Sequence, residues 1–126
     1  MLSDLPVYPI LLSRDLAESR AFYQGLLGLE VVTDKEDRLM VRAGGGTHIV
    51  LSLSTVGTSD TQTQAVWMVP DIHAAVADLR ARGVRIEEYE APDPVTVGGI
   101  ADMGDRWAAW FIDPHRNVLA VVQRKG

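Results

Sequence analysis

The chain carries the same plan twice along its length. A strand-like apolar segment precedes Asp15, where a helix should begin that ends near Gly28. A second such segment precedes Asp71, 56 residues after Asp15, and its helix should end near Gly83. The duplication indicates two copies of one supersecondary unit, which we expect to be related by a pseudo-twofold axis. Corresponding positions in the two copies should then face one another across a shared cleft.

Local signals give each copy one helix and four strands. Asp15 and Asp71 are good N-cap residues, and apolar residues recur at helical spacing after each of them. Strands are expected at residues 7–12, 29–33, 38–43 and 48–54 in the first copy, and at 64–69, 84–90, 106–112 and 117–123 in the second.

These elements predict an α+β fold in a single domain, residues 1–126. The first strand-helix-three-strand repeat covers residues 7–54, and the second covers 64–123. Residues 55–63 are polar and without period, so they are expected to form the linker. The Pro- and Gly-rich stretch 91–105 is expected to be a long loop with room for a short strand segment.

Composition narrows the class of protein. The chain has 126 residues, 47% of them hydrophobic, which is enough for one ordinary core. It has 17 acidic and 12 basic residues and no run of Lys or Arg, so neither nucleic acid nor an anionic membrane is an expected partner. No apolar run approaches the length of a spanning helix and no leader is visible, so we expect a soluble, cytoplasmic protein. The absence of cysteine excludes disulfides and thiolate chemistry.

Motifs that could carry chemistry are sparse. His73 should lie on the solvated side of its helix, His115 in a hairpin turn, and His48 at a strand end near the cleft, where it is a less favoured ligand candidate. The glycines 44–46 indicate a hairpin loop rather than a phosphate cradle, because no Lys-Ser/Thr and helix follow them. The acidic residues within 87–90 favour a solvated strand face over a carboxylate dyad.

The duplicated plan resembles a known family. The tandem repeat, with Phe22-Tyr23 in its first helix and a last hairpin turned by Asp113-Pro114 and Asn117, is similar to the glyoxalase/bleomycin resistance protein/dioxygenase superfamily, also called the vicinal oxygen chelate superfamily. The resemblance covers residues 7–123 and implies βαβββ repeats that form a curved mixed sheet around a cleft, with the helices outside. Arg116 departs from the glycine that the family usually has in the last turn, so strain or a different turn is expected there.

The resemblance also implies where a metal would be held. Family members with chemistry bind a divalent ion through side chains on the first and fourth strands of each repeat. The matching positions here are Tyr8, Gln64, Ala120 and, on the fourth strand, Leu51 or a close neighbour. These residues offer neither imidazole nor carboxylate, which zinc, nickel, manganese and iron prefer. We therefore predict that the metal site is lost and that no cofactor is bound.

Strand parity suggests what lines the cleft instead. If Ile112 pairs with Val118, Trp110 lies directly across from Ala120, while Trp67 points to the helix side of its strand. The predicted ligand-binding residues are Tyr8, Ile10, Leu51, Gln64, Val66, Met68, Trp110 and Ala120.

Two alternatives stay open for this hairpin. A slip of one residue would bring Trp107 and Phe111 to the cleft in place of Trp110. Equally, Trp110 could simply fill the core.

Two classes of function follow from this cleft. The first is a metal-free protein that binds and sequesters an aromatic or cationic antibiotic-like compound; the acidic composition suits a cation. The alternative is a lyase, isomerase or dioxygenase of the same superfamily, either metal-free with Tyr8 as acid or base or metal-dependent through unrecognised ligands. A homodimer is expected in either case, since the sheets would otherwise leave apolar edges and faces exposed.

Overall fold

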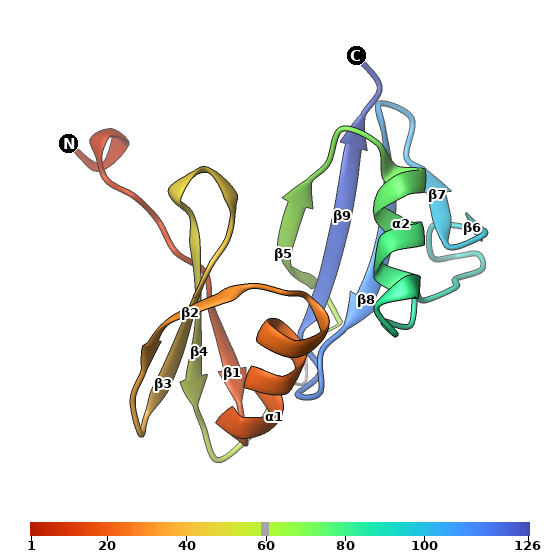
Figure 1. Cartoon of the computed structure of the whole chain (residues 1–126). Helices are drawn as coiled ribbons and strands as arrows, with labels where there is room; N and C mark the ends of the chain where they lie inside the picture. The colour runs from red at the N-terminus through yellow and green to blue at the C-terminus, as the bar shows by residue number, and fades with distance from the viewer. Residues whose placement is uncertain (59–60) are drawn as a thin grey trace. The chain divides into compact units, whose positions relative to one another are not determined.

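The computed structural model describes residues 1–58 and 61–126. The chain divides into two compact units, the first formed by Met1–Asp60 with Pro114–Asn117 and the second by Thr61–Asp113 with Val118–Gly126. Each unit has one sheet and one principal helix, which can be followed by colour in Figure 1. The α+β class predicted from the sequence is confirmed. Within the described residues, no helix is long and apolar enough to cross a membrane.

The first unit has a four-stranded mixed sheet in the order β1-β4-β3-β2 (Figure 1). Its N-terminal strand pairs in parallel with its fourth strand, and the other pairs are antiparallel. The strands are β1 (Ile10–Ser13), β2 (Glu30–Asp34), β3 (Arg38–Arg42) and β4 (His48–Leu53).

One helical segment covers this first sheet. The helix α1 (Leu16–Arg20) begins after Asp15, whose carboxylate accepts the backbone N–H groups of Ala17 and Glu18 as an N-cap. It continues as a π-helical stretch, η2 (Ala21–Leu26), and Gly28 follows with a φ of 73°. The predicted helix and both of its ends are therefore confirmed, although the second half is wider than an α-helix.

The core of the first unit lies between α1 and the sheet. The fully buried Ser19 of α1 donates a hydrogen bond of 2.7 Å to the fully buried Ser13 of β1, which joins the helix to the sheet. The apolar residues on the same face of the strands are almost completely buried: Leu11, Leu39, Val41, Ile49 and Leu51. The opposite face is open, as the 65% exposure of Ile10 indicates.

The second unit has a five-stranded mixed sheet in the order β5-β9-β8-β7-β6 (Figure 1). The pair β5 and β9 is parallel, and the remaining pairs are antiparallel. The strands are β5 (Thr63–Met68), β6 (Thr96–Val97), β7 (Ile100–Asp102), β8 (Arg106–Ile112) and β9 (Val118–Arg124).

The prediction of a strand at residues 84–90 is wrong. Val84 and Ile86 are buried in alternation, as in a strand, but the segment forms no regular ladder with the sheet. The Glu87 N–H donates to the Trp110 carbonyl of β8 at 2.8 Å, and the Tyr89 carbonyl accepts the Thr96 N–H of β6 at 3.1 Å. The reason is that β7, from the stretch 91–105 where only a short strand segment was expected, pairs with β8 at Trp107 and Ala108, which leaves the segment 84–90 only the part of that edge at Trp110. That expected short segment is confirmed and is a small hairpin of two strands, β6 and β7.

The helix α2 (Ile72–Ala81) covers one face of the second sheet (Figure 1). Asp71 caps it through the Ala74 N–H, and the side chain of Gln123 on β9 accepts the N–H of Ile72 at 2.8 Å. Gly83 follows the helix with a φ of 89°, as predicted. On the same face the Trp67 ring stacks on Phe111 at 6.0 Å, so the prediction that Trp67 faces the helix is confirmed.

The last hairpin has the predicted register. Ile112 pairs with Val118 and Trp110 pairs with Ala120, which excludes the one-residue slip. Arg116 in the turn has a φ of 72°, which is the backbone strain that the missing glycine led us to expect.

The predicted linker at residues 55–63 is described only in part. Its residues 59 and 60 lie outside the described residues, and β5 already begins at Thr63, the last residue of the predicted linker.

Candidate functional site

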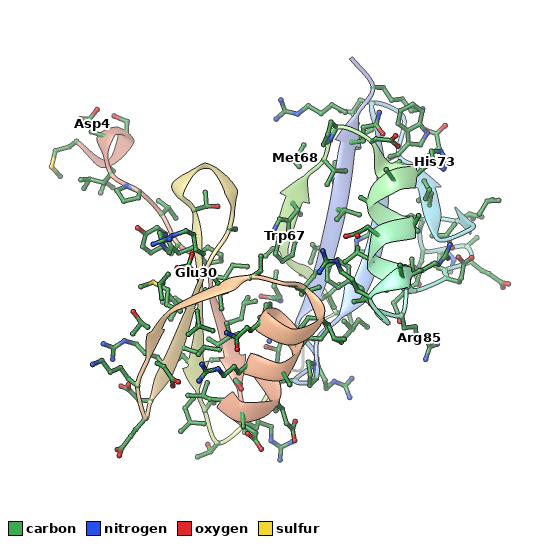
Figure 2. The ribbon with its side chains drawn as sticks, viewed as in Figure 1. Asp4, Glu30, Trp67, Met68, His73 and Arg85 are labelled. Atoms are coloured by element: carbon green, nitrogen blue, oxygen red, sulfur yellow. The ribbon has the colours of Figure 1, made fainter. Side chains whose placement is uncertain are left out.

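The face of the second sheet opposite α2 is the candidate site. Two rows of side chains cross it, because the strand register sets Val66, Ala120 and Trp110 side by side in one row. The next row holds Met68 on β5 (labelled in Figure 2), Val122 and Ala108. We call this surface the open face; it comprises Val66, Met68, Ala108, Trp110, Ala120 and Val122.

The middle of the open face is made of small, buried residues. Ala108 and Ala120 are 3% and 1% exposed, whereas Val66 and Met68 at the β5 side are 47% and 55% exposed. Trp110 is half-buried and packs against the alanines from the β8 side. Met103 also packs against these alanines, so the apolar surface that a planar molecule can reach is that of the half-buried indole and of Val66 and Met68.

Trp110 is held in one orientation by two contacts. Its indole N–H donates to the Thr63 hydroxyl at 3.2 Å. The Tyr89 ring meets it edge to face, with centroids 5.6 Å apart and planes at 83°. An aromatic side chain fixed in this way presents a preorganised stacking surface. The alternative that Trp110 merely fills core holds only in part, since the indole is not fully covered.

A β-bulge changes which polar residue lies beside Trp110. The pairing of β5 with β9 shifts between Thr63 and Ala65, so that Thr63 lies opposite Val118 and Gln64 is the extra residue. The Gln64 amide donates to the carbonyl of Gln62 at 3.1 Å. Strict alternation along β5 predicts Gln64 on the open side next to Val66. The prediction fails because the bulge inserts one residue and puts Thr63 at that position. Thr63 supplies the polar contact to the indole.

One end of the open face opens into a groove of about 500 Å³ between apolar and charged residues. Its charged side chains come from the start of β8 and the end of β9, where Arg106 lies directly opposite Arg124. The Arg106 guanidinium lies 2.7 Å from the Asp105 carboxylate, and this hydrogen bond holds the pKa of Asp105 below its usual value. The groove is lined by Val66, Met68, Asp105, Arg106, Val122, Arg124 and Gly126.

The other end, around Tyr89, has the opposite electrostatic character. Burial raises the pKa of the Tyr89 phenol above its ordinary value, and the charges of Glu87 and Asp93 raise it further. Negative charge near Tyr89 therefore disfavours a phenolate there. Two consequences follow: Tyr89 is a neutral hydrogen-bonding group at physiological pH, and an anion would be repelled from the Trp110 end of the site.

In the first unit, Tyr8 and His48 come together. Tyr8 precedes β1 rather than lying in it, because the predicted first strand is shorter than expected and begins at Ile10. The Tyr8 ring is 38% exposed and lies 4.9 Å from the His48 ring, with planes at 59°. Sequence alone did not pair these two residues, since 40 positions separate them.

Leu51 is not the fourth-strand residue on the open side of the first sheet. It is 0% exposed and pairs with Leu11 on the side that α1 covers. The parallel register identifies its neighbour Val50 instead, because Ile10 pairs with Val50 as Val66 pairs with Ala120 in the second copy. Val50 is thus the repeat counterpart of Ala120.

The donor set at these positions does not fit a divalent metal. The first unit offers Tyr8 and Val50, and the second offers Gln64 or Thr63 with Ala120. None of these is an imidazole or a carboxylate. Over residues 1–58 and 61–126, moreover, no three His, Asp or Glu side chains gather in a way that could hold an ion.

The remaining two histidines are His73 and His115. His73 is exposed on α2, as predicted (Figure 2). His115 lies in the hairpin turn but is only 6% exposed; its Nδ1 accepts the Arg14 N–H at 3.2 Å, and its Nε2 lies 3.3 Å from a Glu18 oxygen. Because Nδ1 accepts a hydrogen bond, the neutral ring carries its proton on Nε2, facing Glu18.

Sequence reasoning also missed two arginines. By the same alternation that placed Trp110 and Ala120, Arg106 and Arg124 project from the same side of the sheet as the open face. Arg106 lies four residues before Trp110 in β8, and Arg124 lies four residues after Ala120 in β9. Continuing the parity count along both strands would have found them.

Comparisons with known proteins agree with this architecture. Residues 7–121 match the Glyoxalase/Bleomycin resistance protein/Dioxygenase superfamily. No curated protein matches the sequence.

Several solved structures share the fold. A glyoxalase/bleomycin resistance protein/dioxygenase from Alicyclobacillus acidocaldarius has a TM-score of 0.73 at 17% identity, covering 98% of this chain and 93% of its own. A bleomycin-binding protein solved in complex with bleomycin has a TM-score of 0.71 at 17% identity, covering 96% and 99%. An antibiotic-binding protein from a Streptomyces species has a TM-score of 0.64 at 19% identity, covering 96% of each chain. At these identities the likeness shows the fold alone.

Proposed function

We propose that this chain, which belongs to the glyoxalase/bleomycin resistance protein/dioxygenase superfamily, is a metal-free binding protein that sequesters a flat, largely apolar small molecule. The observation that carries the proposal is the pairing of Trp110 with Ala120 on the open face. It sets an oriented, half-buried indole against a small buried residue on the accessible side of the sheet.

The physical case rests on preorganisation. The indole is already fixed by Thr63 and Tyr89, so a ligand that stacks on it does not have to restrict its rotation. The groove volume of about 500 Å³ lies within the usual range for small-molecule sites. The exposed Val66 and Met68 supply apolar surface that a ligand would remove from water.

Two of the structural neighbours support an antibiotic-like ligand. One is described as binding bleomycin and another as binding an antibiotic. We extend this to the present chain as a proposal, together with a cytoplasmic location and a homodimer. The homodimer is supported by the exposure of apolar residues on the open sides of both sheets, among them Ile10, Val66 and Met68.

The test is a binding screen read by tryptophan fluorescence. Flat polycyclic compounds, including anthraquinones and naphthoquinones, should quench the protein's emission saturably with micromolar dissociation constants. Replacement of Trp110 by Phe should keep most of the affinity, because a ring remains, and should remove most of the quenching. If no compound of this class binds at millimolar concentration, the proposal fails.

The contact between Tyr8 and His48 favours a second candidate, a metal-free enzyme of the lyase or isomerase type. A phenol and an imidazole side by side on an accessible surface can move a proton between two atoms of a substrate. Tyr8→Phe should then abolish turnover of a substrate and leave its binding within about twofold, whereas a protein that only sequesters its ligand would show no turnover to lose.

A further inference from the structure

The groove at the end of the open face carries an electrostatic imbalance. Arg106 and Arg124 are direct cross-strand partners on one face of the hairpin, an arrangement in which like charges destabilise a sheet. Asp105 pairs with Arg106 at 2.7 Å. Within the described residues, Arg124 has no ion-pair partner, so one guanidinium in this groove is not neutralised.

The uncompensated guanidinium borders apolar surface. Val66, Met68 and Val122 line the same groove as Arg124. Arg124 is itself exposed, so its contact with an anion is screened by salt, while the apolar side chains beside it can cover the flat part of the same molecule. An arginine fork is also the side chain best shaped to hold a carboxylate through two parallel hydrogen bonds.

We infer that the ligand of the open face carries an anionic group, a carboxylate or a group of similar shape, which binds Arg124 while the flat part of the molecule stacks on Trp110. This inference rests on the proposed function and gives its ligand a charge and an orientation. It reverses the expectation of a cationic ligand that the overall acidic composition suggested, because the charge of the groove is local and of the opposite sign.

Distance and charge fix the orientation of such a molecule. Trp110 and Arg106 are four residues apart in β8, which separates the stacking end from the arginine row by about 13 Å at the usual rise of a strand. That span matches a fused aromatic system of three rings with a substituent at its far end. At the Trp110 end, burial raises the pKa of Tyr89 and the negative charges of Glu87 and Asp93 raise it further, so these two carboxylates disfavour an anion there and the arginine row favours one at the other end.

Three probes of equal shape and different charge test the inference: anthracene-2-carboxylate, 2-(hydroxymethyl)anthracene and 2-(aminomethyl)anthracene. At low ionic strength, the carboxylate should bind about tenfold more tightly than the alcohol, and the amine more weakly than either. Added salt should weaken the binding of the carboxylate and leave the affinity for the alcohol unchanged.

Arg124→Gln should remove the tenfold preference and keep the affinity for the alcohol within about twofold. Arg82→Gln is the matched control, because it removes the same charge from the exposed end of α2, and it should keep the preference. Asp105→Asn should strengthen binding of the carboxylate by releasing Arg106. Thermal unfolding of each variant confirms that the fold is retained.

The outcomes separate the two proposals. Equal binding of the three probes, lost in Trp110→Ala, would overturn the anionic ligand and leave the open face as a binding site. A preference for the carboxylate that survives Arg124→Gln, or tighter binding of the amine, would likewise overturn it. Failure of all three probes to bind would overturn the proposed function and this inference together.

Discussion

Truncation of Trp110 to alanine tests the open face most directly. The indole contributes a stacking surface beside Ala120, and the loss of an aromatic anchor of this kind typically costs about 1 to 3 kcal/mol of binding. At about 1.4 kcal/mol per factor of ten, the dissociation constant of a flat ligand should rise by roughly 5- to 150-fold. A titration by isothermal calorimetry measures this without relying on the fluorescence of the residue that is removed.

The same substitution has a stability cost that must be measured separately. Trp110→Ala removes the edge-to-face contact with Tyr89, worth about 0.5 to 1.5 kcal/mol, and the hydrogen bond to Thr63, worth a similar amount. Because the indole is half-buried, we expect a total of about 1 to 3 kcal/mol in urea unfolding, below the usual cost of deleting a fully buried tryptophan. The variant should remain folded under the conditions of the titration.

Trp107→Ala and Trp67→Ala are the matched controls. Both residues lie on the α2 side of the sheet, Trp107 opposite Gln123 and Trp67 stacked on Phe111. Each should lower stability, Trp67→Ala more strongly, and should leave the affinity within about twofold. The reasoning is refuted if Trp110→Ala binds as the unmodified protein does, or if Trp107→Ala loses as much affinity as Trp110→Ala.

Four further outcomes are expected. In urea unfolding, Asn117→Ala should lower the free energy of unfolding by about 2 to 3 kcal/mol, because the fully buried amide donates to the Leu12 carbonyl and accepts a hydrogen bond from the Thr58 hydroxyl. The control Gln64→Ala removes an exposed hydrogen bond and should cost under about 0.5 kcal/mol. In an absorbance titration at alkaline pH, Tyr89 should ionise above its ordinary pKa of 10.0, and the Tyr89→Phe variant identifies which part of the signal belongs to it. Because the folded state holds this proton more tightly than the unfolded state, the free energy of unfolding should fall as the pH rises above 10. Glu87→Gln should reduce that fall, since it removes one of the charges that raise the pKa. Elemental analysis of tag-free protein should find no stoichiometric zinc, nickel, manganese or iron, and one equivalent of any of them would contradict the proposal. Light scattering at micromolar concentration should give twice the chain mass of 13.8 kDa, and a value of one chain would refute the homodimer.

Local signals in the sequence predicted the parts of the fold that depend on near neighbours. The caps at Asp15 and Asp71 and the glycines after each helix are set by backbone hydrogen bonds within a few residues. The pairing of Trp110 with Ala120 was also accessible, because a tight turn fixes the register of a hairpin.

Errors arose where the outcome depends on pairing between distant segments. Leu51 or a close neighbour was expected at the fourth-strand position, because alternation gives two faces but does not say which of them the helix α1 covers, and Leu51 is buried on the α1 side. Gln64 was chosen over Thr63 because a bulge leaves no periodic signal. The strand expected at 84–90 did not form because β7 pairs with part of the β8 edge. No local sequence pattern indicates which of two segments will pair there. Arg106 and Arg124 were missed because charge was considered only as the net charge of the whole chain and not strand by strand.

The small residues beneath Trp110 have a consequence for how the open face can be changed. Ala108 and Ala120 stand in regular strands and are almost completely buried, with Met103 and Trp110 packed against them. A valine or leucine at either position would therefore have to displace one of these two larger side chains, while the pairing of β8 with β9 could stay as it is. A substitution at a residue that a bound molecule does not touch would thus act on the binding surface through the position of the indole.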